Sequence, residues 1–180
     1  MSNLKKPITI AKHTIKNRIC IPPLVCFGFG NDTTSFVVQK NVDHYEQRAK
    51  AGTGLIVVEA TCVTENGKLH PNQLGICRDE HIEGLSKIAD VCHKHKGIVT
   101  IQIHHGGFST HPECGEMVSS SFWETKKGKA RKLSKDEIKK IQSDFVSAAI
   151  RAQKSGFDGV QLHGCHNYLL NAFASELVNQ

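Results

Sequence analysis

Two histidines and a tyrosine lie close together in the segment His163-Gly164-Cys165-His166-Asn167-Tyr168. Two imidazoles three positions apart can each donate an N–H hydrogen bond to a carbonyl oxygen, and the phenol two positions further on can supply a proton. The same pattern also fits a polar strand end that makes only local hydrogen bonds. The spacing alone favours neither interpretation.

A second polar cluster, Gln102-Ile103-His104-His105-Gly106-Gly107, also follows an apolar run. If both runs are strands of one parallel sheet, the two clusters open onto the same edge, which favours a functional site. The imidazoles and Cys165 are also suitable ligands for zinc or iron. Because neither cluster contains an acidic residue, we expect hydrogen-bond donation and no metal.

The elements that must position these clusters follow from the hydrophobic pattern. A short hairpin is expected at 8–15, strands at 18–23, 55–60, 98–103 and 157–163, and helices at about 38–50, 82–92, from 134 to about 154, and from about 168. The helix from Ser134 has the spacing of a capping box with Glu137. The segment 104–131 is predicted to be a long loop.

Strands that alternate with helices predict an α/β fold, because parallel neighbours need a crossover and a helix supplies it. Four such βα units follow the hairpin, with no linker between them, so residues 1–180 are expected to form a single domain. Long polar loops follow the strands, whereas the connections from helix to strand are short. Chemistry is therefore expected at the carboxyl ends of the strands.

The composition narrows the class of protein. Of the 180 residues 39% are hydrophobic and 22% are charged, which is typical of a globular domain. No apolar run approaches membrane-spanning length, and no targeting segment opens the chain, so we expect a soluble cytoplasmic protein with no membrane partner. The seven cysteines form no C-x-x-C motif and are expected to be reduced. Cys26 is a candidate reactive thiol, although an inert cysteine is the simpler interpretation.

The net charge of +6 lies within residues 126–140. No aromatic residue stands among these lysines and arginines to stack on bases. The segment is therefore interpreted as a solvated loop and the start of a helix, and no nucleic-acid partner is expected.

Five longer motifs occur in order at 17–26, 54–60, 73–76 with 79–82, 102–106 and 156–168. Together they resemble the Old Yellow Enzyme or NADH:flavin oxidoreductase family. The resemblance implies a (β/α)₈ barrel with FMN over the carboxyl ends of the strands. The family's FMN is reduced by NAD(P)H and reoxidised by an enone, another activated alkene or a quinone-like acceptor. Because a complete barrel takes roughly 250 residues, the resemblance predicts the N-terminal half of a barrel here.

The resemblance also assigns the site residues. It places Pro23, Leu24 and Val25 beside the flavin ring, Ala60 at its edge, Gln102 on its pyrimidine side, and His163 both on the cofactor and, with His166, on the substrate carbonyl. Tyr168 donates the proton opposite the hydride. Asn167 stands where the family usually has glycine.

An alternative reading is a catalytically inactive half-barrel. Four strands leave two sheet edges, expected at 19–22 and 160–163, with unpaired backbone groups. Such edges favour association of the chain with a second copy or with a complementary C-terminal half.

Overall fold

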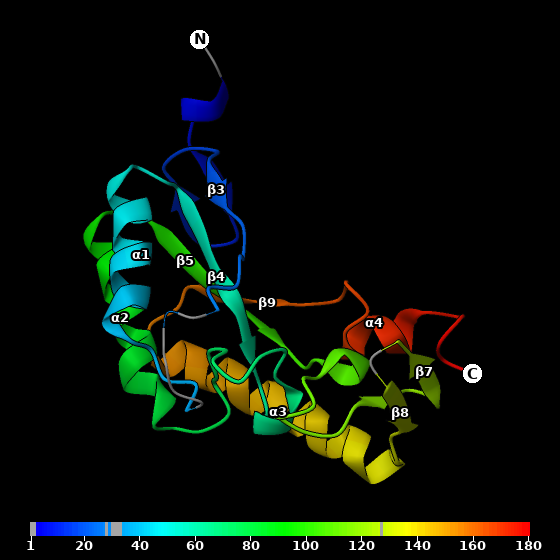
Figure 1. Ribbon diagram of the computed structural model, residues 1–180. Helices are drawn as coiled ribbons and strands as arrows, with labels where there is room; N and C mark the ends of the chain where they lie inside the picture. The colour runs from blue at the N-terminus through cyan, green and yellow to red at the C-terminus, as the bar shows by residue number, and fades with distance from the viewer. Residues whose placement is uncertain (1–2, 28, 30–33, 127) are drawn as a thin grey trace.

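The centre of the fold is a parallel sheet of four strands, seen in a computed structural model that describes residues 3–27, 29, 34–126 and 128–180 (Figure 1). The strands are β3 (Cys20–Ile21), β4 (Leu55–Cys62), β5 (Ile98–His104) and β9 (Gly159–Leu162), and they lie side by side in that order. Leu55 pairs with Ile98, and Gln102 pairs with Gln161. The predicted parallel α/β sheet is confirmed.

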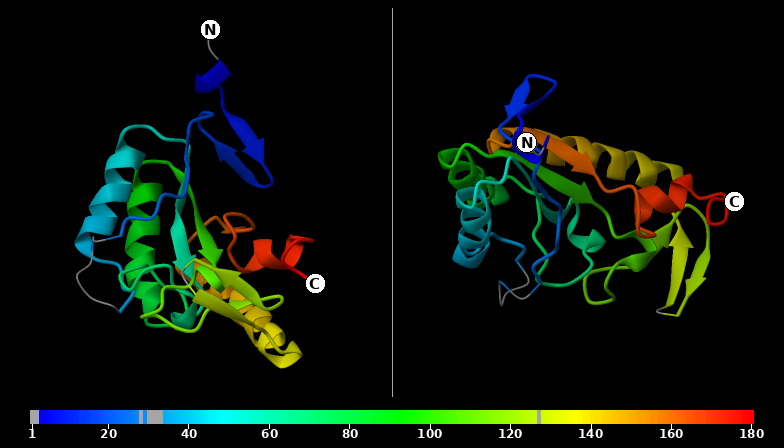
Figure 2. Two further views of the ribbon diagram at one scale, coloured as in Figure 1. Left: turned by 45° about the vertical axis from the view of Figure 1, so that its right-hand side comes forward. Right: turned by 90° about the horizontal axis from the view of Figure 1, so that it is seen from above.

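Helices cover one face of this sheet. They are α1 (Gln39–Lys50), α2 (His81–Lys94) and α3 (Lys135–Lys154), and they lie on the same side of the curved sheet (Figure 2). Their apolar stripes, which include Tyr45, Leu85 and Ile88, form one core cluster with Ile101 and Ile103 of β5. Because side chains alternate along a strand, Thr100, Gln102 and His104 lie on the opposite face.

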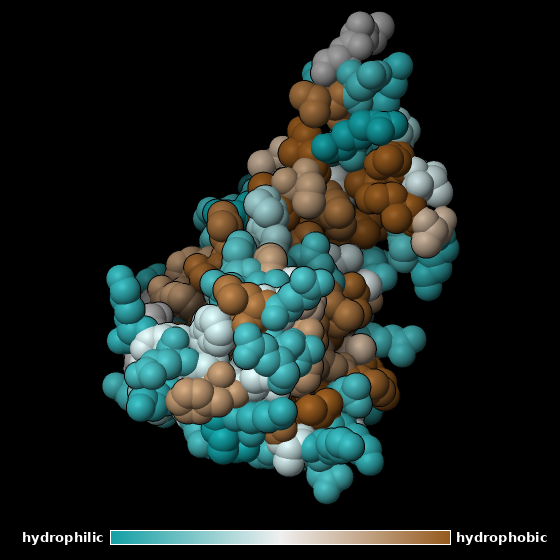
Figure 3. Space-filling model, turned by 90° about the vertical axis from the view of Figure 1, so that its right-hand side faces the viewer, coloured by the Kyte–Doolittle hydropathy of each residue, from teal (hydrophilic) through white to brown (hydrophobic). Residues whose placement is uncertain are grey.

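The N-terminal hairpin is also confirmed. Strands β1 (Ile8–Ile10) and β2 (His13–Ile15) pair antiparallel after a 3₁₀ turn, η1 (Asn3–Lys5). A Cβ added to Gly54, just before β4, would lie 2.6 Å from Asn17 Oδ1, so the chain after the hairpin packs against the amino end of the sheet. Apolar side chains gather over this part of the surface (Figure 3), where Leu4 and Ile10 are exposed.

The predicted long loop at 104–131 is wrong in part. It contains a 3₁₀ turn, η3 (Gly107–Ser109), and a small sheet of β6 (Val118–Ser119), β7 (Trp123–Thr125) and β8 (Gly128–Lys132), in the order β6-β8-β7. Ala130 of β8 is fully buried and packs in a cluster with Phe108 and Val178. This sheet lies beside α4 (Leu169–Ala174), as Figure 1 shows.

The basic segment is therefore a strand and a helix start, and part of its charge is paired locally. The guanidinium of Arg131 on β8 donates to both carboxylate oxygens of Glu137 at 3.0 and 2.8 Å, and also contacts Glu116 at 3.0 Å. Lys129 lies 3.8 Å from Glu124. These pairs support a solvated surface as the interpretation of the positive charge.

Other boundaries follow from local chemistry. β3 ends at Ile21, shorter than expected, because Pro22 and Pro23 lack the N–H groups that a ladder needs. α3 begins at the predicted capping box: Glu137 N–H donates to Ser134 Oγ, and Ser134 N–H donates to Glu137 Oε2. A further 3₁₀ turn, η2 (Glu65–Gly67), follows β4. None of the helices described is long and apolar enough to cross a bilayer.

Candidate functional site

The carboxyl ends of β4, β5 and β9 meet at one edge of the sheet, where both polar clusters lie. Gln102 and His104 are on β5, and His163 follows β9 directly, with its N–H donating to Ile103 O at 3.1 Å. Ala60 is on the neighbouring strand β4. The sequence expectation that the two clusters open onto the same edge is confirmed for these residues.

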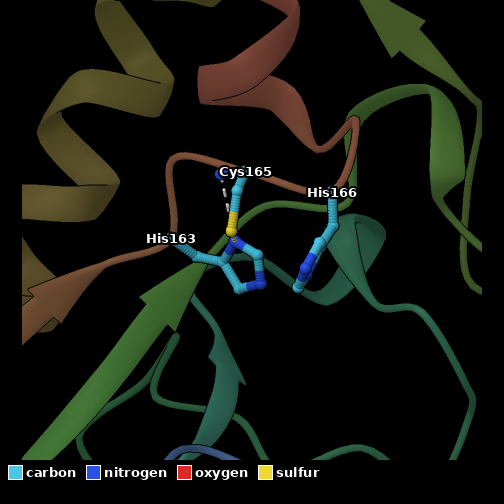
Figure 4. Close-up of side chains that lie close together, drawn as sticks. All are labelled: His163, Cys165 and His166. Carbon is cyan, nitrogen blue, oxygen red and sulfur yellow. Dashed lines mark hydrogen bonds between the residues drawn. The ribbon is translucent and has the colours of Figure 1, made fainter.

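His163, His166 and Tyr168 form a compact group. The His163 ring centroid lies 5.2 Å from that of His166 and 4.6 Å from that of Tyr168, and both pairs are edge to face. His163 is buried, Tyr168 is half-buried and His166 is exposed. Figure 4 shows His163, Cys165 and His166 pointing toward one another from the chain that follows β9. The structure thus brings together the three side chains assigned to the acceptor.

The loop that presents this group needs two successive residues in the left-handed region. His166 has φ 58° and Asn167 has φ 61°. Asparagine tolerates this conformation better than most residues, which fits Asn167 at a position where the resemblance implies glycine. The loop is closed by hydrogen bonds from Asn167 N–H to Asn171 Oδ1 (2.9 Å) and from Leu169 N–H to His105 O (3.1 Å).

The environment keeps both potential donors in their neutral forms. Burial, and then the neighbouring His166, lower the pKa of His163. Burial, followed by the nearby Cys165, raises the pKa of Tyr168. Near neutral pH, His163 therefore offers one N–H group as a neutral imidazole, and Tyr168 retains the O–H group needed to donate a proton.

His104 belongs to the second polar cluster of the sequence, which gave it no individual role. It is fully buried on β5, and its ring centroid lies 5.5 Å from that of Tyr168 and 6.1 Å from that of His163. Burial, then the adjacent His105 and His163, lower its pKa to about 3. His104 is therefore a neutral imidazole next to His163 and Tyr168.

Gln73 fixes the tautomer of His104. Leu69 N–H donates to Gln73 Oε1 at 2.7 Å, and Gln73 Nε2 donates to Ala60 O at 2.6 Å, so the orientation of the amide is set. The same nitrogen lies 2.6 Å from His104 Nε2. Because an amide nitrogen only donates, His104 Nε2 accepts and the ring proton is on Nδ1. Within the described part of the chain this Nδ1–H is buried without a hydrogen-bond partner.

His105, by contrast, points away from this edge. Its Nδ1 accepts from Gly107 N–H at 3.0 Å, and a Cβ added to Gly67 would lie 2.8 Å from its ring. Burial lowers its pKa to about 4. Of the two adjacent histidines in the second cluster, only His104 faces the site.

The loop after β3 is tied to the same edge through Glu59. Cys26 N–H donates to Glu59 Oε2 at 2.8 Å, and the Tyr45 hydroxyl donates to Glu59 Oε1 at 3.2 Å. The loop therefore lies against the strand that carries Ala60, with Pro23 half-buried and with Leu24 and Val25 exposed. Burial and then Glu59 raise the pKa of the Cys26 thiol to about 12, which favours the inert interpretation of this cysteine.

Comparison with known proteins places this geometry in a family. The model of the NADH:flavin oxidoreductase / NADH oxidase family matches residues 3–180. An NADPH dehydrogenase of Clostridium acetobutylicum is 39% identical over 174 residues, which are 95% of this chain and 50% of that protein. An NADPH dehydrogenase of Bacillus cytotoxicus is 36% identical over 99% of this chain and 52% of its own length. The chain spans about half the length of the curated relatives it matches.

Comparison with solved structures leads to the same family. Old Yellow Enzyme from Pichia sp. AKU4542 has a TM-score of 0.89 at 28% identity, covering 99% of this chain and 50% of that one. Morphinone reductase in complex with tetrahydroNAD has a TM-score of 0.86 at 25% identity, covering 100% of this chain and 54% of that one. The four βα units correspond to the N-terminal half of a (β/α)₈ barrel.

Proposed function

Because the chain belongs to the NADH:flavin oxidoreductase / NADH oxidase family, we propose that it carries the acceptor site of an FMN-dependent NAD(P)H oxidoreductase of the ene-reductase type. The proposed acceptors are enones, other activated alkenes and quinone-like compounds. The observation that carries this proposal is the meeting of His163, His166 and Tyr168 at the carboxyl edge of a parallel sheet.

The residues at this edge fit the ring of FMN. Leu24 and Val25 expose apolar side chains on the loop tied to β4. Gln102 presents an amide from the face of β5 opposite the helices. We propose that Pro23, Leu24 and Val25 contact the ring, that Ala60 touches its edge, and that Gln102 and His163 bind its polar groups. When bound and reduced by NAD(P)H, FMN supplies the hydride for the acceptor.

The histidines are proposed to hold the carbonyl oxygen of the acceptor. Negative charge develops on this oxygen when the alkene is reduced, and donors fixed in advance stabilise that charge most where it is greatest, in the transition state. His163 is held by the packing of its neighbours, with Tyr168 and His166 against its ring. Tyr168 keeps its proton until the reaction requires it, because burial raises its pKa.

The proposal is tested by adding FMN and NADPH to the chain and following the reduction of an enone and of a quinone. Loss of one donor in His163→Ala or His166→Ala is expected to slow enone reduction by about 10²–10³-fold. Tyr168→Phe keeps the ring and is expected to slow enone reduction while quinone reduction, which takes protons from water, largely survives. Equal loss with both acceptors in Tyr168→Phe would contradict its role as proton donor.

A specific observation favours a second candidate, a half-barrel whose function depends on a partner. Strands β3 and β9 are the edges of the sheet, and β9 exposes Val160 (41%) and Leu162 (60%). In the register with Ile101 and Ile103, these two side chains lie on the face that helices cover elsewhere. We propose that this edge pairs with a second copy or with a complementary C-terminal half.

The two candidates differ in cofactor binding. If the chain alone is an inactive half, FMN binds weakly or not at all, NADPH oxidation is near background, and sedimentation shows dimers or larger assemblies. A monomeric chain with stoichiometric FMN and full turnover would contradict the second candidate.

A cytoplasmic location is part of the proposal, supported by seven free thiols, which are typical of a reducing compartment.

A further inference from the structure

We propose that His163, Cys165 and His166 form a zinc-binding site. The three residues offer two imidazole nitrogens and one thiolate, a set that zinc binds without any carboxylate. The absence of acidic residues in the motif is therefore no obstacle to zinc. The proposal rests on these three side chains. Because His163 and His166 are also proposed to hold the acceptor, bound zinc would occupy the acceptor site.

The spacing of the donor atoms fits a tetrahedral ion. Cys165 Sγ lies 3.6 Å from His163 Nδ1. Zn–S bonds of about 2.3 Å and Zn–N bonds of about 2.0–2.1 Å at the tetrahedral angle place sulfur and nitrogen about 3.5 Å apart. One donor atom from each of the three residues lies within 4.8 Å of the others. His166 is exposed, so its ring can turn by the small amount that closes the set.

The lone pair on Nδ1 of His163 faces the Cys165 thiol. Cys165 N–H donates to His163 Nδ1 at 3.5 Å, so this nitrogen is the unprotonated one and its lone pair points toward the loop that carries the thiol. When zinc binds, the Cys165 thiol releases its proton to solvent and the thiolate takes its place as a ligand.

The site is open to an ion from solution. Cys165 and His166 are exposed, and a Cβ added to Gly164 would meet no atom within 4 Å. Three protein ligands leave the fourth position of zinc for water or a small ligand, as in zinc sites that are not purely structural.

A second group of possible ligands, Glu65, Cys77 and His81, is less suitable. Lys68 Nζ lies 2.6 Å from Glu65 Oε2, and an Arg78 guanidinium nitrogen lies 3.6 Å from Glu65 Oε1. These cations already occupy the carboxylate and would repel a metal ion. Cys77 therefore provides a matched control for Cys165.

The test is a titration of the full chain, kept reduced and free of metal, with Co²⁺ as a spectroscopic substitute for Zn²⁺. We expect one equivalent to bind, with a thiolate-to-cobalt charge-transfer band and the visible bands of a tetrahedral ion, and we expect Zn²⁺ to displace it. Cys165→Ala should abolish the charge-transfer band. His166→Ala should weaken Zn²⁺ binding, measured by calorimetry, by about tenfold or more, because even indirect support of a metal is worth about 10–100-fold.

Cys77→Ala should leave the band and the affinity unchanged. The proposal is overturned if the wild-type chain gives no charge-transfer band, if the band survives in Cys165→Ala, or if Cys77→Ala removes it. Circular dichroism of each variant checks the fold, and Cys165→Ser offers a closer match in size if the alanine variant unfolds.

Discussion

Replacing Gln73 with leucine is expected to destabilise the chain strongly. Gln73 is fully buried. Its side-chain oxygen accepts a hydrogen bond from Leu69 N–H, and its side-chain nitrogen donates to Ala60 O and His104 Nε2. Leucine leaves Ala60 O and His104 Nε2 buried without partners, and each such loss costs about 1–3 kcal/mol. Leu69 N–H is only partly buried and can bond water. The free energy of unfolding should therefore fall by about 2–6 kcal/mol.

The measurement is urea unfolding followed by far-UV circular dichroism, with Gln102→Leu as the matched control. Gln102 is also a buried glutamine, but the one hydrogen bond its amide nitrogen donates goes to Oε1 of Gln161, an exposed side chain that can turn to water. Its loss should cost only about 0.5–1.5 kcal/mol. Equal losses in the two variants, or a loss below about 1 kcal/mol for Gln73→Leu, would refute the reasoning.

The hydrogen bond between Gln73 and His104 can also be tested by NMR. Nitrogen-15 NMR of the wild-type chain should show His104 with an unprotonated Nε2 and a protonated Nδ1 at neutral pH, because Gln73 Nε2 can only donate. A proton on Nε2 would contradict the assigned orientation of the Gln73 amide.

Three further predictions concern stability and association. Burial raises the pKa of Glu59 above its ordinary value of 4.5. Between the pKa values of the unfolded and folded states, the folded chain keeps a proton that the unfolded chain has lost. The contribution of Glu59 to stability should therefore fall as pH rises through this range. Buried histidines such as His104 titrate with the opposite sign, so the measurement is the difference in unfolding free energy between the wild type and Glu59→Gln in urea at several pH values. The wild type should lose stability relative to Glu59→Gln as pH rises; a constant or growing advantage of the wild type would contradict the prediction. Ser134→Ala should lower the unfolding free energy by about 1 kcal/mol through loss of the cap, whereas Ser143→Ala, on the exposed face of the same helix, should not. Leu162→Lys should weaken self-association in sedimentation velocity, whereas Val146→Lys on α3 should have no effect; equal effects would argue against pairing through β9.

The sheet and its helices could be predicted because their signals are local. The apolar run from Leu55 contains β-branched residues in a continuous stretch, and the Ser134–Glu137 pair marks a helix start within four residues. The small sheet β6-β8-β7 has no such signal. Its strands are two to five residues long, and β8 buries only Ala130 among exposed lysines and arginines. Tertiary pairing, and not sequence pattern, decides its structure.

The same distinction applies to the site. His163, His166 and Tyr168 are neighbours along the chain, so their spacing already suggested a common role. The contact between Gln73 and His104 joins residues 31 positions apart. It depends on how the chain after β4 folds back onto β5, and no local pattern specifies that. The link from Glu59 to Cys26 and Tyr45 is equally invisible in the sequence, because it joins three separate elements.

The order of strands in the sheet has a consequence for how the chain folds during synthesis. Each strand of the series β3, β4, β5 and β9 pairs with the one made immediately before it, so the sheet can lengthen by one strand at a time as the ribosome advances. No strand has to wait for a later one to be inserted beside it, which limits the exposure of unpaired edges that makes larger proteins prone to aggregate. At each stage the sheet has two open edges, which are β3 and the newest strand. A further strand, whether from the same chain or from a partner, can therefore be added at β9 without disturbing any pair already formed.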